Sequence, residues 1–473
     1  MLSRPVSDEP RNLSIRRNVV SKALLAAFVV FSAFPVYAQE KSGPPPRQLR
    51  GRAVEGLIES KGEASIKQFI ETHLAPSYRA SFESEQALVK HLEEIRNACV
   101  GFGGVLVDPV GNDGVLIKFM MEGSESAVMM RIDTAPPNQI VALDLQPKGA
   151  RPQRPEVAPI SWENLSQRLD EEAAQGFTGS VLVARGGKIV LHQGYGLANR
   201  EKKIANGKET IFAIGSTPID FTRGAILKLE EQDKLKTSDP ITKFFDNVPA
   251  DKQSMTIDHL MNRGSGLPDF HHVAGVDADP DLTWIDRDTA VQRILGATLL
   301  FPPGQGEAHS HSAWVLLAAV VEIVSKQSYG DFVRTNFFEP AGMTRTGNHE
   351  DAEKFADDEF AVGYEGQSVG QLNIPKYWGR TSWLVMGSGG MQSTPMDLYR
   401  WNQAIRSNKT LSPQAAKKYW HDGIFMGGDD RGFMCLYNEG PGDMFILCSN
   451  AHSGPGDRTS AVGRRLVELV TKR

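Results

Sequence analysis

One serine at the start of a helical pattern limits most strongly what this chain can fold into and do. Ser216 lies within residues 211–222, which read Ile-Phe-Ala-Ile-Gly-Ser-Thr-Pro-Ile-Asp-Phe-Thr, and the apolar positions of a predicted helix over 223–232 follow directly. The exposed amide groups and the dipole at the start of a helix stabilise negative charge. Negative charge that develops near Ser216 would therefore be stabilised.

The same stretch resembles the motif Phe-x-Ile-Gly-Ser-x-x-Lys-x-Phe-Thr of the serine β-lactamase and penicillin-binding-protein superfamily. The resemblance is to the branch that contains class C β-lactamases, D,D-peptidases and related esterases. In that family the serine attacks an acyl carbonyl, and the lysine one helical turn later helps to take its proton. Here the lysine position is Ile219, which cannot accept a proton. The resemblance implies a kept nucleophile, Ser216, and a lost base.

The residues around Ser216 leave other roles open. Its hydroxyl could simply cap the helix, and Pro218 is tolerated in a first helical turn but disfavours helical backbone at Thr217. Asp220 is expected to favour the helix dipole rather than to serve as a substitute base. Loss of a general base typically costs about 10²–10⁴-fold in rate. Fold and activity therefore have to be argued separately.

Further matches to the superfamily follow in its usual order from residue 160 to 473. They are a β-hairpin over 179–192, the segment 260–269, a glycine-rich turn over 387–397, and two closing strands over 433–438 and 444–450. The resemblance implies an α+β fold: an antiparallel β-lactamase-like sheet packed by helices, beside an all-helical half. It also implies a site in the crevice between the two.

The second motif of the superfamily, Tyr-x-Asn, corresponds to residues 303–312, Pro-Gly-Gln-Gly-Glu-Ala-His-Ser-His-Ser. The match puts His309 at the tyrosine, which shuttles the proton in the family, and His311 at the asparagine. Histidine can transfer a proton near neutral pH, so one hypothesis is a dyad of Ser216 as nucleophile and His309 as base. The competing hypothesis is that both histidines only fill a vacant cleft.

A metal site is a further hypothesis for these histidines, with His271 and His272 as additional ligands. However, no acidic or cysteine ligand completes a recognisable metal-binding pattern in the sequence. We therefore expect neither a metal nor another cofactor.

The third motif, Lys/His-x-Gly, lies on the strand that lines the cleft and neutralises a substrate carboxylate in the family. Its best match is 425–433, which puts Phe425 at the position of the cation and keeps Gly427 and Gly428. Arg431 could supply the charge from a displaced position. We predict Phe425, both glycines and His311 as ligand-binding positions. Backbone amides that form an oxyanion hole do not depend on side-chain identity.

The first 38 residues are typical of a secretory signal peptide. Basic residues up to Lys22 precede an apolar run over 23–34, and Ala38 offers a small residue at the cleavage point. Pro35 and the short run argue against a membrane anchor. We expect a periplasmic or secreted protein that contacts the membrane only through this segment.

The rest of the chain is predicted to contain two folded domains. Apolar residues at helical spacing, followed by alternating segments, predict a small α+β accessory domain. The predicted boundaries are a signal peptide over 1–38, a linker over 39–50, the small domain over 51–147, a linker over 148–159, and the β-lactamase-like domain over 160–473.

Charge and cysteines exclude two classes of protein. A formal net charge of -5 provides no basic field for nucleic acid. The cysteines are Cys99, Cys435 and Cys448, an odd number that leaves at least one unpaired. A bridge between Cys435 and Cys448 across a predicted hairpin turn is conceivable, but we expect separately buried side chains. A disulfide scaffold is not indicated.

Changes at all three motifs favour a protein that no longer uses the family's lysine-dependent chemistry. The preferred hypothesis is a non-catalytic protein that binds a ligand or partner in its cleft, such as a small acyl compound or a peptidoglycan fragment. The alternative is a divergent serine esterase that uses Ser216 and His309. Esters are preferred to β-lactams for that alternative, because activated esters demand less of the base.

Overall fold

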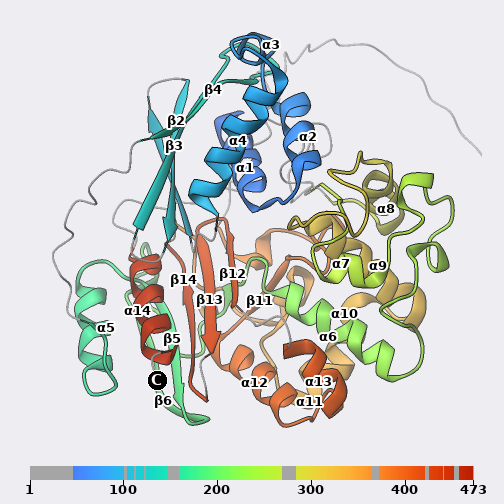
Figure 1. Cartoon of the computed structure of the whole chain (residues 1–473). Helices are drawn as coiled ribbons and strands as arrows, with labels where there is room; N and C mark the ends of the chain where they lie inside the picture. The colour runs from blue at the N-terminus through green and yellow to red at the C-terminus, as the bar shows by residue number, and fades with distance from the viewer. Residues whose placement is uncertain are drawn as a thin grey trace, which may run out of the picture. The chain divides into compact units, whose positions relative to one another are not determined.

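The fold is described from a computed structural model of the chain (Figure 1). The described residues are 46–100, 104–110, 113–121, 124–146, 159–268, 284–364, 372–420, 425–439, 442–451 and 458–471. The predicted signal peptide, most of its linker and the linker over 148–158 lie outside these ranges. No described helix is both long enough and apolar enough to cross a membrane.

Residues 46–146 combine helices with one antiparallel sheet of order β1-β2-β3-β4. The elements are α1 (Pro46–Glu59), α2 (Glu63–His73), α3 (Pro76–Arg79), α4 (Glu85–Cys99), β1 (Gly104–Val110), β2 (Gly114–Met121), β3 (Ser124–Ile132) and β4 (Ile140–Gln146). Apolar residues at helical spacing on α2 and α4 meet alternate residues of β2 and β3 in a core of their own. The boundaries of the small domain stay a prediction.

A five-stranded antiparallel sheet, of order β12-β13-β14-β5-β6, is the centre of the larger part of the chain. Its strands are β5 (Gly179–Arg185), β6 (Lys188–Tyr195), β12 (Phe425–Asp430), β13 (Phe433–Glu439) and β14 (Met444–Ser449). Side chains alternate between the two faces of a strand. Val181 and Val183 therefore pack toward α5 (Leu165–Ala174) and α14 (Thr459–Thr471), while Leu182 and Ala184 join the main core.

The main core also contains the helical half, which lies beside the sheet in Figure 1. Its helices are α6 (Pro218–Glu231), α7 (Ile257–Met261), α8 (Arg287–Gly296), α9 (His311–Ser325), α10 (Tyr329–Val333), α11 (Glu339–Ala341), α12 (Pro395–Arg406) and α13 (Pro413–Trp420). Every residue from Ala313 to Val321 on α9 is buried, so this helix runs through the core. This sheet and these helices confirm the predicted α+β fold.

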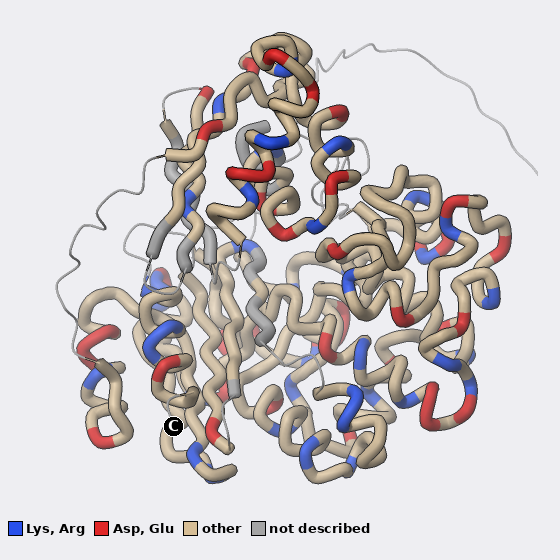
Figure 2. The backbone as a smooth tube through the Cα atoms, viewed as in Figure 1, with Lys and Arg blue, Asp and Glu red and all other residues tan. Residues whose placement is uncertain are grey.

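Short elements complete the larger part of the chain. They are β7 (Leu197–Asn199), β8 (Ile204–Ala205), β9 (Phe212–Ala213), β10 (Gly347–Asn348), β11 (Met391–Ser393), and helical turns at Ile241–Lys243, Ala250–Lys252, Arg334–Phe338, His349–Lys354, Asp357–Glu359 and Pro375–Tyr377. Strands β10, β11 and β9 form a small sheet in that order. Basic and acidic residues are mixed along the outer helices in Figure 2.

Candidate active site

Ser216 lies in the tight turn between β9 and α6. Backbone pairing of β9 with β11 and a hydrogen bond from the Ile214 amide to the Met391 carbonyl (3.2 Å) fix the start of the turn. Gly215 then takes a left-handed backbone conformation, φ 50°, which favours glycine. The turn therefore presents Ser216 at the amino-terminal end of α6.

The Ser216 hydroxyl does not cap this helix. The N-cap residue is Thr217, and no side chain caps the helix; Thr217 keeps helical backbone angles although Pro218 follows it. Instead, Ser216 Oγ lies 3.0 Å from His311 Nε2, at hydrogen-bond distance. The capping hypothesis is therefore not the arrangement found in the structure.

His311 is the first residue of α9, and its neighbours in the chain anchor it. Ser310 is the N-cap of α9, and its Oγ accepts a hydrogen bond from the Ala313 amide (3.2 Å). The hydroxyl groups of Ser310 and Ser312 both donate to the Pro268 carbonyl, at 3.4 Å and 2.9 Å. The residues on both sides of His311 are thus hydrogen-bonded to the segment around Pro268.

The histidine at hydrogen-bond distance from Ser216 is therefore His311, and the catalytic role that the motif match suggested for His309 stays a prediction. The His309 ring lies edge-on to the His311 ring, with centroids 4.7 Å apart and an interplanar angle of 87°. The physical reason is where α9 begins: with Ser310 as N-cap, His311 occupies the first helical turn. The sequence carries a partial signal for this, because Ser310 and Ser312 both lie just before a long apolar run that begins at Ala313, and serine is favoured as an N-cap.

The former lysine position contributes no charged or proton-accepting group. Ile219 is buried on α6, with 3% of its surface exposed, and belongs to the main apolar core. Asp220 is also buried, at 2%. The charge that the family places one turn after the serine has been replaced by a core side chain.

The edge strand β12 lies directly against the backbone of Ser216. A Cβ atom added to Gly428 would be only 2.1 Å from the Ser216 amide nitrogen, so position 428 has to be glycine. Within the described residues, the Ser216 amide donates no hydrogen bond. An unused amide at the start of a helix, beside the unpaired edge of a sheet, can stabilise an oxyanion.

The structure places the remaining third-motif residues along this hairpin. Gly427 lies on β12 opposite Leu436, and Phe425 is the first residue of the strand; the Phe425 side chain lies outside the described residues. Arg431 is in the turn after β12, where its guanidinium stacks 4.5 Å from the centroid of the Trp378 ring. Ligand binding by Phe425, Gly427 and Gly428 stays a prediction.

The metal hypothesis names two further histidines as ligands. His271 and His272 lie outside the described residues. In the described part of the chain, no three His, Cys, Asp or Glu side chains are grouped as metal ligands. The metal hypothesis stays untested.

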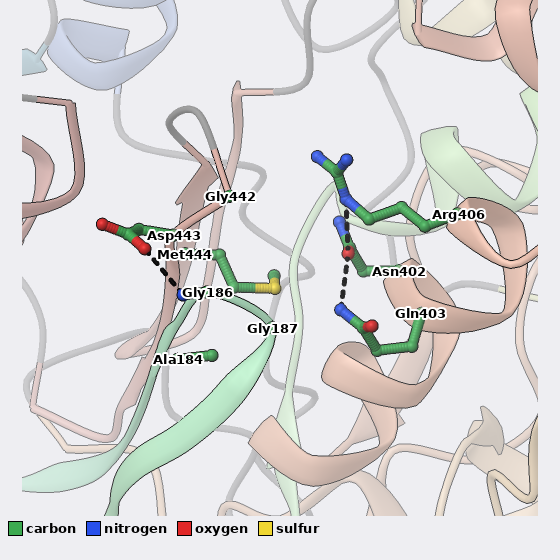
Figure 3. A pocket seen from close by; sticks show the side chains of 9 residues that line it. All are labelled: Ala184, Gly186, Gly187, Asn402, Gln403, Arg406, Gly442, Asp443 and Met444. Carbon is green, nitrogen blue, oxygen red and sulfur yellow. Dashed lines mark hydrogen bonds between the residues drawn. The ribbon is translucent and has the colours of Figure 1, made fainter. Parts of the chain in front are cut away.

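A cavity of about 140 Å³ lies elsewhere in the same domain (Figure 3). The hairpin turns at Gly186 and Gly442 and the helix α12 line it. On α12, Arg406 and Gln403 both donate to Asn402 Oδ1, at 3.2 Å and 3.3 Å. Neither Ser216 nor His311 lines this cavity, so it is not the candidate active site.

An antiparallel sheet beside a helical half, with a serine at the start of a buried helix, defines a serine-hydrolase architecture. Residues 164–434 match the family model described as Beta-lactamase, and the chain belongs to this family. Homologues and structural neighbours place it within the serine β-lactamase and penicillin-binding-protein superfamily, which confirms the resemblance found in the sequence.

Known proteins of this superfamily match the chain over part of its length. The penicillin-binding protein PbpX of Bacillus subtilis is 31% identical over 248 residues, which are 52% of this chain and 60% of that protein. A penicillin-binding protein of Bacillus halodurans is 22% identical, with a TM-score of 0.51 over 62% of this chain and 97% of its own. FmtA of Staphylococcus aureus is 20% identical, with a TM-score of 0.53 over 67% and 92%.

The contact of Gly428 with Ser216 predicts that alanine destabilises the protein more at position 428 than at a glycine with open space around it. Gly428→Ala should lower the free energy of unfolding by about 1–3 kcal/mol, because the added methyl group overpacks the Ser216 amide. Gly296→Ala is the matched control, since a Cβ atom there would meet nothing within 4 Å. Thermal and denaturant unfolding of both variants measure the effect. Equal stability of the two variants would contradict the placement of β12.

Proposed function

We propose that this protein is a serine hydrolase in which Ser216 is the nucleophile and His311 is the general base. The observation that carries the proposal is the 3.0 Å separation of Ser216 Oγ and His311 Nε2. A nucleophile and a base within hydrogen-bond reach are the minimum arrangement for acyl transfer. The proposal departs from the non-catalytic hypothesis that the sequence favoured.

The proposed reaction uses one imidazole ring for every proton transfer. Neutral His311 accepts the proton from Ser216 Oγ as the oxygen attacks the carbonyl carbon, and the carbonyl oxygen becomes an oxyanion. The Ser216 amide stabilises that charge from the start of α6. Collapse of the intermediate expels the leaving group, which takes the proton from His311. Water then enters by the same path, releases the acid and regenerates Ser216.

The position of His311 suits the role of a base. Imidazole is the side chain that ordinarily exchanges a proton near neutral pH. His311 is the first residue of α9, where the positive end of the helix dipole disfavours a positive charge on the ring. Its supporting hydrogen bonds from Ser310 and Ser312 to Pro268 hold the backbone in place.

Neutral acyl esters are the substrates that this site would accept best. An alkoxide from an activated ester leaves with less help from an acid than an amine does, and the lysine of the family is replaced by Ile219. Phe425 stands where the family has a cation for a substrate carboxylate. We therefore propose small esters, rather than β-lactams or free-carboxylate peptides, as the substrate class.

A non-catalytic ligand-binding function is the second candidate. The observation in its favour is Ile219, which is buried in the core where the family places a charged lysine. In this version the crevice binds a small acyl compound or a peptidoglycan-like ligand without turning it over. Only the hydrolase candidate predicts a rate of ester hydrolysis that depends on Ser216.

The pH dependence of ester hydrolysis separates the two candidates. With a short-chain p-nitrophenyl ester, the rate should rise with pH through the titration of a histidine, because only neutral imidazole accepts the Ser216 proton. Ser216→Ala and His311→Ala should each lower the rate by about 10²–10⁴-fold. The double variant should be little worse than either, as for residues that act as a unit.

His309→Ala is the matched control for this experiment, since the ring is adjacent to His311 but not bonded to Ser216. It should keep most of the activity. A background rate that is unchanged by Ser216→Ala would favour the ligand-binding candidate. Loss of activity in His309→Ala but not in His311→Ala would restore the assignment from the motif match.

We also propose that the protein is exported and acts in the periplasm or outside the cell. The apolar run over 23–34 and the small residue Ala38 support a cleaved signal peptide. The mature chain should then begin near Gln39, and amino-terminal sequencing of protein recovered from the native host measures this. An intact Met1 or Leu2 in that protein would overturn the proposal.

A further inference from the structure

Two cysteines lie directly opposite each other on adjacent strands of the main sheet. The register of β13 and β14 pairs Cys435 with Cys448, and both side chains are fully buried. Their sulfur atoms are 3.8 Å apart, with the Cys448 thiol donating to Cys435 Sγ. The two side chains therefore point toward each other within the core.

The backbone geometry at this pair is compatible with a disulfide bond. Directly opposite residues in an antiparallel sheet have Cα atoms about 4.5–5.5 Å apart. A disulfide spans Cα separations of about 4.4–6.8 Å. Bringing the two sulfur atoms from 3.8 Å to bonding distance therefore requires rotation of the two side chains and only a small approach of the strands.

We propose that Cys435 and Cys448 form an intramolecular disulfide when the chain folds in the presence of a disulfide oxidant. The thiolate of one cysteine attacks the oxidant, forms a mixed disulfide and releases one thiol. The second cysteine attacks its partner's sulfur and releases the other thiol. Two protein thiols are oxidised, and one oxidant disulfide is reduced to two thiols. The proposal does not depend on whether Ser216 is catalytic.

The reaction has to occur before the sheet closes. Both sulfur atoms lie in side chains with 0% exposure, so an oxidant has no access to them in the folded protein. Burial, and secondarily the neighbouring Cys435, raise the pKa of the Cys448 thiol well above its ordinary value, which leaves little reactive thiolate. A reduced, folded chain is therefore expected to stay reduced.

The bond would lie in a row of residues that leads to the candidate active site. Cys435 pairs with Gly428 on its other side, and Cys448 pairs with Ser180. Gly428 is the residue whose backbone lies against the Ser216 amide. Covalent connection of β13 to β14 would therefore fix the strand on which this contact depends.

Refolding tests the proposal on the whole chain. Reduced, denatured protein is refolded with oxidised glutathione, alkylated without reduction, and examined by intact-mass and peptide mass spectrometry. The expected product has lost two hydrogens, with the bond mapped to Cys435 and Cys448. Native reduced protein treated with the same oxidant should keep all its thiols. Free thiols or separate glutathione adducts at both positions after refolding would overturn the proposal.

Two further measurements guard against a folding defect in the variants. Cys99→Ala should leave the product unchanged, whereas Cys435→Ala should abolish it. If Cys435→Ala does not fold, the oxidised and reduced forms of the natural chain can be compared directly. The melting temperature of the oxidised form should be several degrees higher than that of the reduced form. Reduction of the oxidised form under denaturing conditions, followed by refolding, should remove this difference. Refolded, oxidant-treated protein that keeps free thiols at both positions and melts like the reduced form would contradict the proposed bond.

Discussion

The hydrogen bond between Ser216 and His311 joins the amino-terminal ends of two helices that are packed into one apolar core. Helix α6 carries Ser216 at its start, and α9 carries His311 as its first residue. Because nearly every side chain near the start of each helix is buried, neither end can shift without disturbing the core. The distance between the two side chains is therefore set by the packing of both helices, together with the tight turn that holds Ser216 before α6.

This arrangement explains how the fold can persist after its usual lysine has been lost. Ile219 adds apolar surface to the core at a position where a lysine would need a partner for its charge. Burial of such a side chain contributes about 1.5–3 kcal/mol relative to exposure. In the proposed hydrolase the proton acceptor has to come from another element, and His311 lies at hydrogen-bond distance from Ser216.

The main features of the large domain could be predicted from sequence because motifs of a known superfamily follow in their usual order from residue 160 to 473. The serine at a helix start, the glycine turns and the alternating strands each require particular residues at particular spacings. The choice between His309 and His311 was different, since the two are only two residues apart and the answer depends on where α9 begins. The N-cap residue Ser310 contains that information, but motif matching does not read it.

The sequence also could not show that Cys435 and Cys448 lie directly opposite each other on adjacent strands. Both flank the predicted hairpin turn, but the length and geometry of the turn set which residues face each other, and a shift by one residue would separate the pair. The contact of Gly428 with Ser216 joins segments more than two hundred residues apart, so no local pattern could reveal it. Such contacts arise only when the sheet and the helical half pack together.

Labelling with a fluorophosphonate tests most directly whether Ser216 and His311 act as a nucleophile and its base. Attack of an activated serine on phosphorus expels fluoride and leaves a covalent adduct that intact-mass spectrometry detects. The account predicts one adduct on the natural chain, none on Ser216→Ala, and labelling slowed by about 10²-fold or more in His311→Ala. A folded natural chain that stays unlabelled, or a Ser216→Ala variant that is labelled equally fast, would contradict it.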